Sequence, residues 1–239
     1  MSELMLKDKL ALVTGASRGI GRAIAKALAA EGAHVIATAR TQGGLEALDD
    51  EIKAAGGQCT LVPLDQMDPE GIEKLAEIVG ERWGKLDILV AAAGQLGELT
   101  PASQVSARTW NEVMGVNVIA PARLIRAFEP LLLKSDAGRA VFLTSGAAKS
   151  CRAFWAPYAA SKAALDALVK SWADEHGKDA LRINLINPGP MRTAMRKKAF
   201  PSEDQDTLPP PDALVPLILS LVGPDVTRHG EWIDFPSEG

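Results

Sequence analysis

The chain has 239 residues, of which 47% are hydrophobic and 23% charged, and its formal net charge is −4. This length and composition fit one globular domain and exclude a general nucleic-acid binder, which would carry a basic surplus. The two cysteines, Cys59 and Cys151, are too few for a disulfide framework, so we expect reduced intracellular thiols.

Neither end of the chain has the pattern of a targeting or membrane segment. Residues 1–9 mix charges and lack the apolar core of a signal peptide. The longest apolar run near the C-terminus, residues 214–222, is too short to span a bilayer. We therefore expect a soluble cytoplasmic protein with no membrane partner and no nucleic-acid partner.

Apolar runs typical of strands alternate with helical patterns along the whole chain. In chain order the predicted elements are strand 10–13, a helix from Gly19, strand 34–39, helix 45–55, strand 59–64, a helix from Asp68, strand 86–91, a helix from Ser106 to Leu132, strand 139–143, helix 157–176, and strands 181–186 and 231–235. Such alternation requires crossover connections and predicts an α/β fold. We expect a Rossmann-type, doubly wound parallel sheet of about seven strands in a three-layer α/β/α arrangement. Residues 1–239 are predicted to form a single domain.

Two helices carry specific start or bend signals. Asp68 followed by Pro69 is typical of a helix N-terminus, and Ser106 is predicted to cap the long helix. Pro121 is predicted to bend that helix, because proline supplies no amide hydrogen. Residues 192–212 read as an irregular insertion at a strand end, so a substrate loop is predicted at about residues 190–212.

A glycine-rich turn, TGASRGIG at residues 14–21, follows the first predicted strand and opens the first helix. Glycines allow the backbone to approach a pyrophosphate, and a helix N-terminus attracts anions. The alternative is a purely structural tight turn. The context of strand, turn and helix favours nucleotide binding.

The end of the second strand indicates which nucleotide is bound. NAD binders place a carboxylate there against the ribose hydroxyls, but this strand ends in Ala39 and Arg40. A carboxylate would repel a 2′-phosphate, whereas the Arg40 guanidinium can bind one with two hydrogen bonds. Unless Arg40 is only a solvated surface charge, the expected cofactor is NADP(H).

With these features the sequence resembles the classical short-chain dehydrogenases/reductases along almost its whole length. The resemblance is carried in order by the turn at residues 14–21, Asp65, Asn117, Ser145, YAASK at residues 158–162, Pro188-Gly189 and Thr193. The chain departs from the family after the fourth strand, where AAAG at residues 91–94 replaces NNAG or NAG. That change puts the local hydrogen bonds in doubt, although Gly94 still permits close backbone approach.

The resemblance implies an NADP(H)-dependent oxidoreductase that reduces a carbonyl to an alcohol or catalyses the reverse. Tyr158 would exchange the proton, Ser145 would orient the substrate oxygen, Lys162 would lower the pKa of Tyr158, and the Asn117 carbonyl would hold a water of the proton relay. The last role gains weight because Pro121, four residues on, has no amide to compete for that carbonyl; the alternative is that Pro121 only kinks or ends a helix. The implied cofactor-binding residues are Gly15, Ser17, Arg18, Gly19, Ile20, Gly21, Arg40, Asp65, Gly94, Tyr158, Lys162, Pro188, Gly189 and Thr193.

Three of these assignments have a simpler alternative. Arg18 occupies a position that is often basic in NADPH-preferring family members, but it could be a surface charge. Asp65 would meet the adenine amino group, or it is an ordinary loop acid. Ser145 could merely cap its loop, beside Thr144.

Other candidates are weaker. The three histidines are scattered without ligand spacing, so no metal is expected. The basic cluster of Arg192, Arg196, Lys197 and Lys198 could receive an anionic substrate or a carrier's phosphate, but a solvated basic face is favoured. The competing function is an NADP(H)-binding regulatory protein without turnover. The expected partner is a small carbonyl or alcohol substrate, and the family resemblance implies a homodimer or homotetramer.

Overall fold

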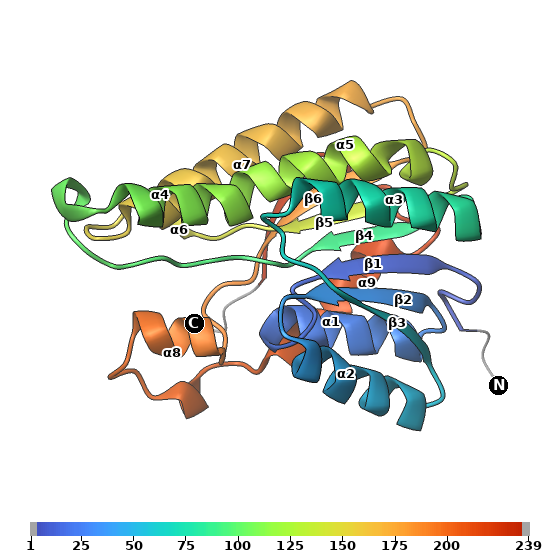
Figure 1. Ribbon diagram of the computed structural model, residues 1–239, viewed down its shortest axis with the longest axis horizontal. Coiled ribbons are helices and arrows are strands. Elements are labelled where there is room, and N and C mark those ends of the chain that lie inside the picture. The colour runs from blue at the N-terminus through green and yellow to red at the C-terminus, as the bar shows by residue number, and fades with distance from the viewer. Residues whose placement is uncertain (1–3, 236–239) are drawn as a thin grey trace.

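The computed structural model describes residues 4–235, and its seven strands form one parallel sheet in the order β3-β2-β1-β4-β5-β6-β7 (Figure 1). The strands are β1 (Leu10–Thr14), β2 (His34–Ala39), β3 (Gln58–Pro63), β4 (Ile88–Ala91), β5 (Arg139–Leu143), β6 (Arg182–Asn187) and β7 (Trp232–Asp234). Every predicted strand is present, with its ends shifted by at most two residues. The predicted Rossmann-type fold is confirmed.

Helices cover both faces of the sheet (Figure 1). One face carries α1 (Gly19–Ala30), α2 (Gln42–Ala54) and α9 (Val215–Val222). The other carries α3 (Pro69–Trp83), α5 (Ala120–Leu132), which continues the line of α4 (Ala107–Met114), and α7 (Ala156–Glu175). Each helix buries one apolar stripe against the sheet, as the three-layer arrangement requires.

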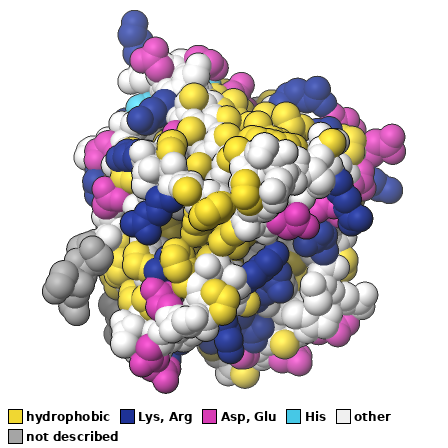
Figure 2. Space-filling model, turned by 90° about the vertical axis from the view of Figure 1, so that its left-hand side faces the viewer, with side chains coloured by type: hydrophobic (Ala, Val, Ile, Leu, Met, Phe, Trp, Pro, Cys, Tyr) yellow, Lys and Arg dark blue, Asp and Glu magenta, His cyan; other side chains and the backbone are white. Residues whose placement is uncertain are grey.

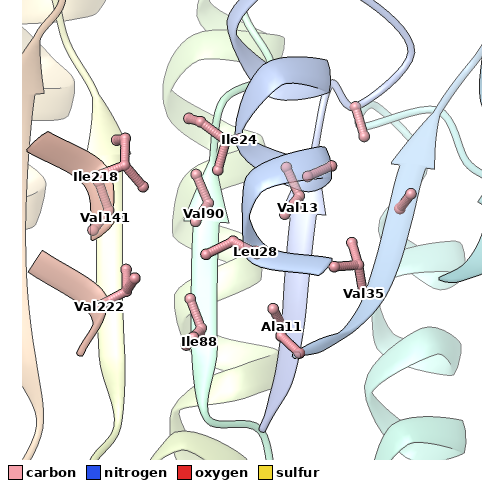
Figure 3. Close-up of a cluster of buried hydrophobic side chains, with 14 of the residues drawn as sticks. Ala11, Val13, Ile24, Leu28, Val35, Ile88, Val90, Val141, Ile218 and Val222 are labelled. Atoms are coloured by element: carbon pink, nitrogen blue, oxygen red, sulfur yellow. The ribbon is translucent and has the colours of Figure 1, made fainter. Parts of the chain in front are cut away.

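The core on the α1 side shows how the sheet is held (Figure 3). Side chains of α1 and α9 meet those of the central strands, among them Ile24, Leu28, Val13, Val90, Val141 and Ile218. Each of these is at most 1% exposed. Burial of one such side chain contributes about 1.5–3 kcal/mol, so the strand ends beneath the site are rigidly placed.

The two predicted helix caps are present. The Asp68 carboxylate accepts a hydrogen bond from the Gly71 amide at 3.1 Å, with Pro69 in the first turn of α3. The Ser106 hydroxyl accepts one from the Thr109 amide at 3.0 Å at the start of α4. Capping side chains satisfy amides that have no partner within a helix, and they fix where each helix begins.

The long helix differs from the prediction at its centre. Between α4 and α5 the chain forms a π-helical turn, Gly115–Ile119, in which the Ala120 amide donates to the Gly115 carbonyl five residues back. This irregularity precedes Pro121 rather than coinciding with it. Because Pro121 has no amide to close a regular turn, the widened turn accommodates it.

The segment predicted to be irregular contains a short helix, α8 (Ala194–Ala199), and two 3₁₀ turns, Gln205–Thr207 and Pro211–Leu214. A further short helix, α6 (Ala147–Ser150), follows β5. Such short helices have no repeating apolar pattern to reveal them in the sequence. Within residues 4–235 no helix is long and apolar enough to cross a membrane.

Candidate active site

A cleft of about 1220 Å³ opens at the carboxyl ends of the strands. It lies where the strand order reverses, because β1 pairs with β2 on one side and β4 on the other. Doubly wound sheets bind their ligands at such switch points. Every predicted site residue except Asn117 lines this cleft. Figure 2 views this face, on which hydrophobic and basic side chains lie next to one another.

The glycine-rich turn between β1 and α1 depends on the absence of side chains. A Cβ added at Gly21 would lie 2.4 Å from the Gly15 carbonyl oxygen, and one at Gly15 would lie 2.9 Å from Ala93. Gly15 and Gly19 also have positive φ angles, +67° and +56°. The turn is therefore tight enough to bring backbone amides to the cleft, as pyrophosphate binding requires.

The start of α1 and the end of β2 suit a phosphorylated ribose. Within the fully described first turn of α1 there is no acidic residue, and the extended N-cap, Arg18, makes no side-chain cap hydrogen bond. Arg18 and Arg40 are both exposed and line the cleft, as do Ser17 and Ile20. These residues fit a nucleotide that carries a 2′-phosphate.

Asp65 lines the cleft after β3, but its side chain also shapes its own loop. Its Oδ1 accepts a hydrogen bond from the Met67 amide at 2.9 Å, and its carbonyl accepts one from the Asp68 amide at 3.0 Å. This turn leads directly into α3. The two interpretations of Asp65, cofactor contact and loop acid, are therefore compatible.

Tyr158 and Lys162 lie one turn apart on α7, deep in the cleft, where they are 8% and 4% exposed. The Lys162 ammonium lies 5.8 Å from the centre of the Tyr158 ring and donates a hydrogen bond to the Leu143 carbonyl at 2.7 Å. Ser145, two residues beyond β5, lines the same cleft, and its hydroxyl accepts a hydrogen bond from the Ala147 amide at 3.2 Å. The structure thus brings Ser145, from the loop after β5, into the same cleft as the Tyr158–Lys162 pair of α7.

The electrostatics of this group differ from the prediction in one respect. Burial raises the pKa of the Tyr158 hydroxyl, opposed by the hydrogen bond with Ser145, whereas the sequence analysis expected Lys162 to lower it. Burial also lowers the pKa of Lys162 to about 8, opposed by the carboxylate of Asp166. Desolvation disfavours the charged form of both groups, so Tyr158 is held as the neutral, proton-carrying phenol.

Asn117 lies behind the cleft in the π-helical turn, 1% exposed. Its side-chain oxygen accepts from the Gln95 amide at 2.8 Å, and its nitrogen donates to the Gln95 carbonyl and to the Ser161 hydroxyl, both at 2.9 Å. The side chain therefore ties the loop after β4 to α7, beside Lys162. The sequence analysis assigned a role only to the Asn117 carbonyl and missed this link.

These contacts also show how the chain manages without the family's asparagines after β4. Ala93 donates its amide to the Thr14 hydroxyl at 3.1 Å, which ties the loop to the end of β1. Asn117 holds the same loop two residues further on, through Gln95. Gly94 remains exposed between them, where an added Cβ would lie 3.8 Å from the Lys162 nitrogen.

Asn187, at the end of β6, is a positioning residue that the sequence analysis missed. Its Oδ1 accepts from the Gly146 amide at 2.9 Å and the Gly189 amide at 3.2 Å, and its Nδ2 donates to the Asp234 carboxylate at 2.7 Å. It thereby joins the loop of Ser145 to the Pro188-Gly189 turn. An Asn before Pro-Gly at a strand end is a turn signal that could have revealed it.

The far end of the cleft is closed by α8. Thr193 lines the cleft and caps α8 by accepting from the Arg196 amide at 3.1 Å. The basic cluster is largely paired: Arg196 binds Glu203 through two nitrogens and Arg192 binds Asp206. Lys198 donates to the Gly97 carbonyl at 3.2 Å. This pairing favours the interpretation of the cluster as a surface feature over an anion site.

Metal ligation has no obvious place in the described part of the chain. Among residues 4–235, His, Cys, Asp and Glu side chains form no group of three or more that could hold an ion. His34 instead contacts Gln58 and Thr60, and His176 contacts Glu129 and Asp179. The expectation that no metal takes part stays a prediction.

Comparison with known proteins identifies the family. The model of the short chain dehydrogenase family matches residues 9–204. The oxidoreductase YciK of Escherichia coli strain K12 is 41% identical over 227 residues, which cover 94% of this chain and 90% of YciK. The 3-oxoacyl-[acyl-carrier-protein] reductase FabG of the same strain is 36% identical over 199 residues, covering 83% of this chain and 79% of FabG.

A solved structure agrees with these sequence relatives. The crystal structure of a short chain dehydrogenase from Shigella flexneri 2a strain 301, complexed with NADP, superposes with a TM-score of 0.93 at 40% identity. The alignment covers 98% of this chain and 99% of that one. Fold, cleft and sequence therefore agree, and the chain belongs to the short-chain dehydrogenase/reductase family of oxidoreductases.

Proposed function

We propose that the protein is an NADP(H)-dependent oxidoreductase that reduces a carbonyl compound to an alcohol, or catalyses the reverse reaction. The observation that carries this proposal is that the buried Tyr158 and Lys162 and the half-buried Ser145 line one cleft. A phenol kept protonated by burial is suited to give its proton to a carbonyl oxygen.

NADP(H) is proposed as the cofactor on the chemistry of the cleft. The glycine turn and the start of α1 would hold the pyrophosphate, Arg18 and Arg40 the 2′-phosphate, and Asp65 the adenine. Gly94, Pro188, Gly189 and Thr193 line the remaining length of the cleft toward Tyr158. The NADP complex of the Shigella flexneri relative supports this choice. The nicotinamide supplies the hydride when bound.

The chain's own residues perform the proton chemistry. Ser145 donates a hydrogen bond to the substrate oxygen and holds it beside Tyr158. Tyr158 transfers its hydroxyl proton to that oxygen as the carbonyl becomes an alcohol, and the reverse reaction returns the proton to it. Lys162 stabilises the tyrosinate that forms and hydrogen-bonds the nicotinamide ribose.

Asn117 is proposed to support reprotonation. Its carbonyl receives no amide from Pro121, and a buried carbonyl without a partner costs about 1–3 kcal/mol. A water bound there would satisfy it and connect the Lys162 ammonium to solvent. The Asn117 side chain is fully used in holding Gln95 and Ser161, so only the carbonyl remains for this role.

The test is a panel of ketones and aldehydes with NADPH, followed by loss of nicotinamide absorbance. We expect at least one carbonyl compound to be reduced, and NADPH to bind more tightly than NADH in calorimetry. The regulatory alternative would be favoured if NADPH binds tightly but no carbonyl compound is reduced with NADPH and no alcohol is oxidised with NADP. Absence of NADPH binding would contradict both the oxidoreductase and the regulatory protein, because each requires the cofactor. A single-domain, cytoplasmic homodimer or homotetramer is proposed as the working form.

A further inference from the structure

Two aromatic side chains from distant parts of the sequence meet beside Tyr158. Trp155 lies 5.9 Å from Tyr158, ring centre to ring centre, in an edge-to-face arrangement. Phe200, at the end of α8, lies 5.6 Å from Trp155 at an interplanar angle of 35°. Both line the cleft and both are partly exposed to it. Together they form an aromatic wall at the position where the substituents of a carbonyl bound to Tyr158 must lie.

The local structure holds this wall in place from both sides. Trp155 is the N-cap of α7, and its carbonyl accepts from the Ala159 amide at 2.8 Å, so its distance from Tyr158 is set by the helix. Phe200 ends α8, and the Arg196 guanidinium stacks on its ring at 3.8 Å while binding Glu203. An aromatic ring fixed in this way loses little conformational freedom when a ligand packs against it.

Further apolar side chains line the same end of the cleft, which also includes Arg152 and Lys198. Leu96 and Val116 line it and are only 5% and 8% exposed. Met195 of α8 reaches inward, so that a Cβ at Gly94 would lie 4.0 Å from its terminal methyl group and 3.8 Å from the Lys162 nitrogen. The acids that pair with Arg192 and Arg196 neutralise those two cations. With Arg196 bound to Glu203 and Lys198 bound to the Gly97 carbonyl, the aromatic wall and its apolar neighbours match a neutral, apolar substituent.

We propose that Trp155 and Phe200 determine substrate choice, and that the substrates are neutral carbonyl compounds in which the carbonyl carbon bears a flat aromatic group. This inference rests on the proposed carbonyl reduction. Aromatic rings prefer edge-to-face or offset contacts with one another, and the tilted pair of Trp155 and Phe200 offers both a ring face and a ring edge. A saturated ring of the same size has neither the flatness nor the charge distribution to use these contacts.

The experiment compares acetophenone with cyclohexyl methyl ketone, which have the same carbon skeleton but differ in flatness. The value of kcat/KM with NADPH is measured for both ketones in the wild-type protein and in Trp155→Leu and Phe200→Leu. We expect each variant to lower the ratio of acetophenone to cyclohexyl methyl ketone by about tenfold, because the aromatic contact is lost while apolar volume is largely retained. The affinity for NADPH should not change.

Phe154→Leu is the matched control. Phe154 is the neighbour of Trp155, is 55% exposed and does not line the cleft, so its replacement should leave the ratio unchanged. A third ketone, 4-acetylbenzoate, separates flatness from charge: we expect it to be a poorer substrate than acetophenone. A better rate with 4-acetylbenzoate would show that an anionic group is recognised and would overturn the claim of a neutral substrate.

The outcomes separate this inference from the proposed function. If ketones are reduced but Trp155→Leu and Phe200→Leu lower both kcat/KM values equally, the aromatic wall is structural and the inference is overturned while carbonyl reduction stands. If the ratio moves in Phe154→Leu as well, the effect is not specific to the cleft and the inference is likewise overturned. If neither these ketones nor the wider carbonyl panel oxidises NADPH, both proposals fail.

Discussion

The two ends of the cleft are built on different principles. The nucleotide end is shaped by backbone, namely the glycine turn after β1, the start of α1 and the loop after β4, to which the side chains of Arg18, Arg40 and Asp65 are added. The substrate end consists of side chains on α7 and on the short helix α8, which Lys198 joins to the loop after β4. The cofactor site is therefore formed by the turns that the fold itself requires, whereas the substrate site depends on side chains that the fold leaves free to vary.

Tyr158→Phe acts where the two ends meet and should have the largest effect. Removal of the hydroxyl takes away the proton donor, so we expect kcat to fall by at least about 10²-fold. The affinity for NADPH should be nearly unchanged, because the ring remains in place. Steady-state kinetics and calorimetry measure the two quantities. Turnover close to that of the wild type would exclude Tyr158 as the general acid.

Ala39→Asp tests the nucleotide end. A carboxylate at the end of β2 would repel the 2′-phosphate and accept hydrogen bonds from a ribose diol, so preference should move from NADPH toward NADH. A charge-assisted contact is worth roughly 1.5–3 kcal/mol, which corresponds to about tenfold to hundredfold in the ratio of dissociation constants. Ala54→Asp, on the exposed end of α2, is the control. An unchanged ratio in Ala39→Asp would refute the charge argument.

Gly21→Ala tests whether the turn itself is the site. The new methyl group would lie 2.4 Å from the Gly15 carbonyl oxygen, so the turn must open, at a cost of about 1–3 kcal/mol of stability and with weaker NADPH binding. Gly43 lies in α2 with nothing within 4 Å of an added Cβ, and Gly43→Ala should stabilise the fold by roughly 0.5–1 kcal/mol. Denaturant unfolding and calorimetry report both changes. If Gly21→Ala and Gly43→Ala have the same stability and the same affinity for NADPH, the turn has no special role in cofactor binding.

The pH dependence of NADPH binding should show the smallest effect. Burial lowers the pKa of Lys162 to about 8, so the ammonium is charged below that pH and neutral above it. A charged donor binds the ribose more strongly, and we expect affinity to fall by about fivefold as pH rises through 8. Asp166 raises the pKa of Lys162, so Asp166→Asn should move this fall to lower pH.

Asp174→Asn, an exposed position further along α7, is the control for Asp166→Asn and should leave the pH profile in place. An affinity that does not vary with pH in the wild-type protein would show that Lys162 keeps its charge or does not contact the cofactor. A shift produced by both variants would show that net charge alone, rather than the position of Asp166, is responsible.

The nucleotide end could be predicted because its signals are local and ordered along the chain. The turn at residues 14–21, the missing acid at Ala39 and the caps Asp68 and Ser106 each depend on a few neighbouring residues. Because the strands are parallel, these features all follow strand ends at the same edge of the sheet. Even the chain's departure from the family pattern at residues 91–94 could be identified from sequence, although not its consequence.

The substrate end could not be predicted because its contacts join residues far apart in sequence. Trp155, at the start of α7, meets Phe200, at the end of α8. Asn117, in the π-helical turn, holds Gln95 in the loop after β4 and Ser161 on α7. The effect of burial on the pKa of Tyr158 was missed for the same reason: burial depends on everything that packs around the ring, whereas the i, i+4 lysine is visible in the sequence.

The fastening of α8 has a consequence for the timing of each catalytic cycle. Both ion pairs lie within residues 192–206, whereas Lys198 joins α8 to the loop after β4 by its bond to the Gly97 carbonyl. One hydrogen bond contributes only about 0.5–1.5 kcal/mol, so α8 separates from that loop at little cost. Opening motions of such short segments take microseconds to milliseconds and often govern product release. In the proposed reaction, the strength of this one bond should therefore act on how long the alcohol stays in the cleft rather than on proton transfer.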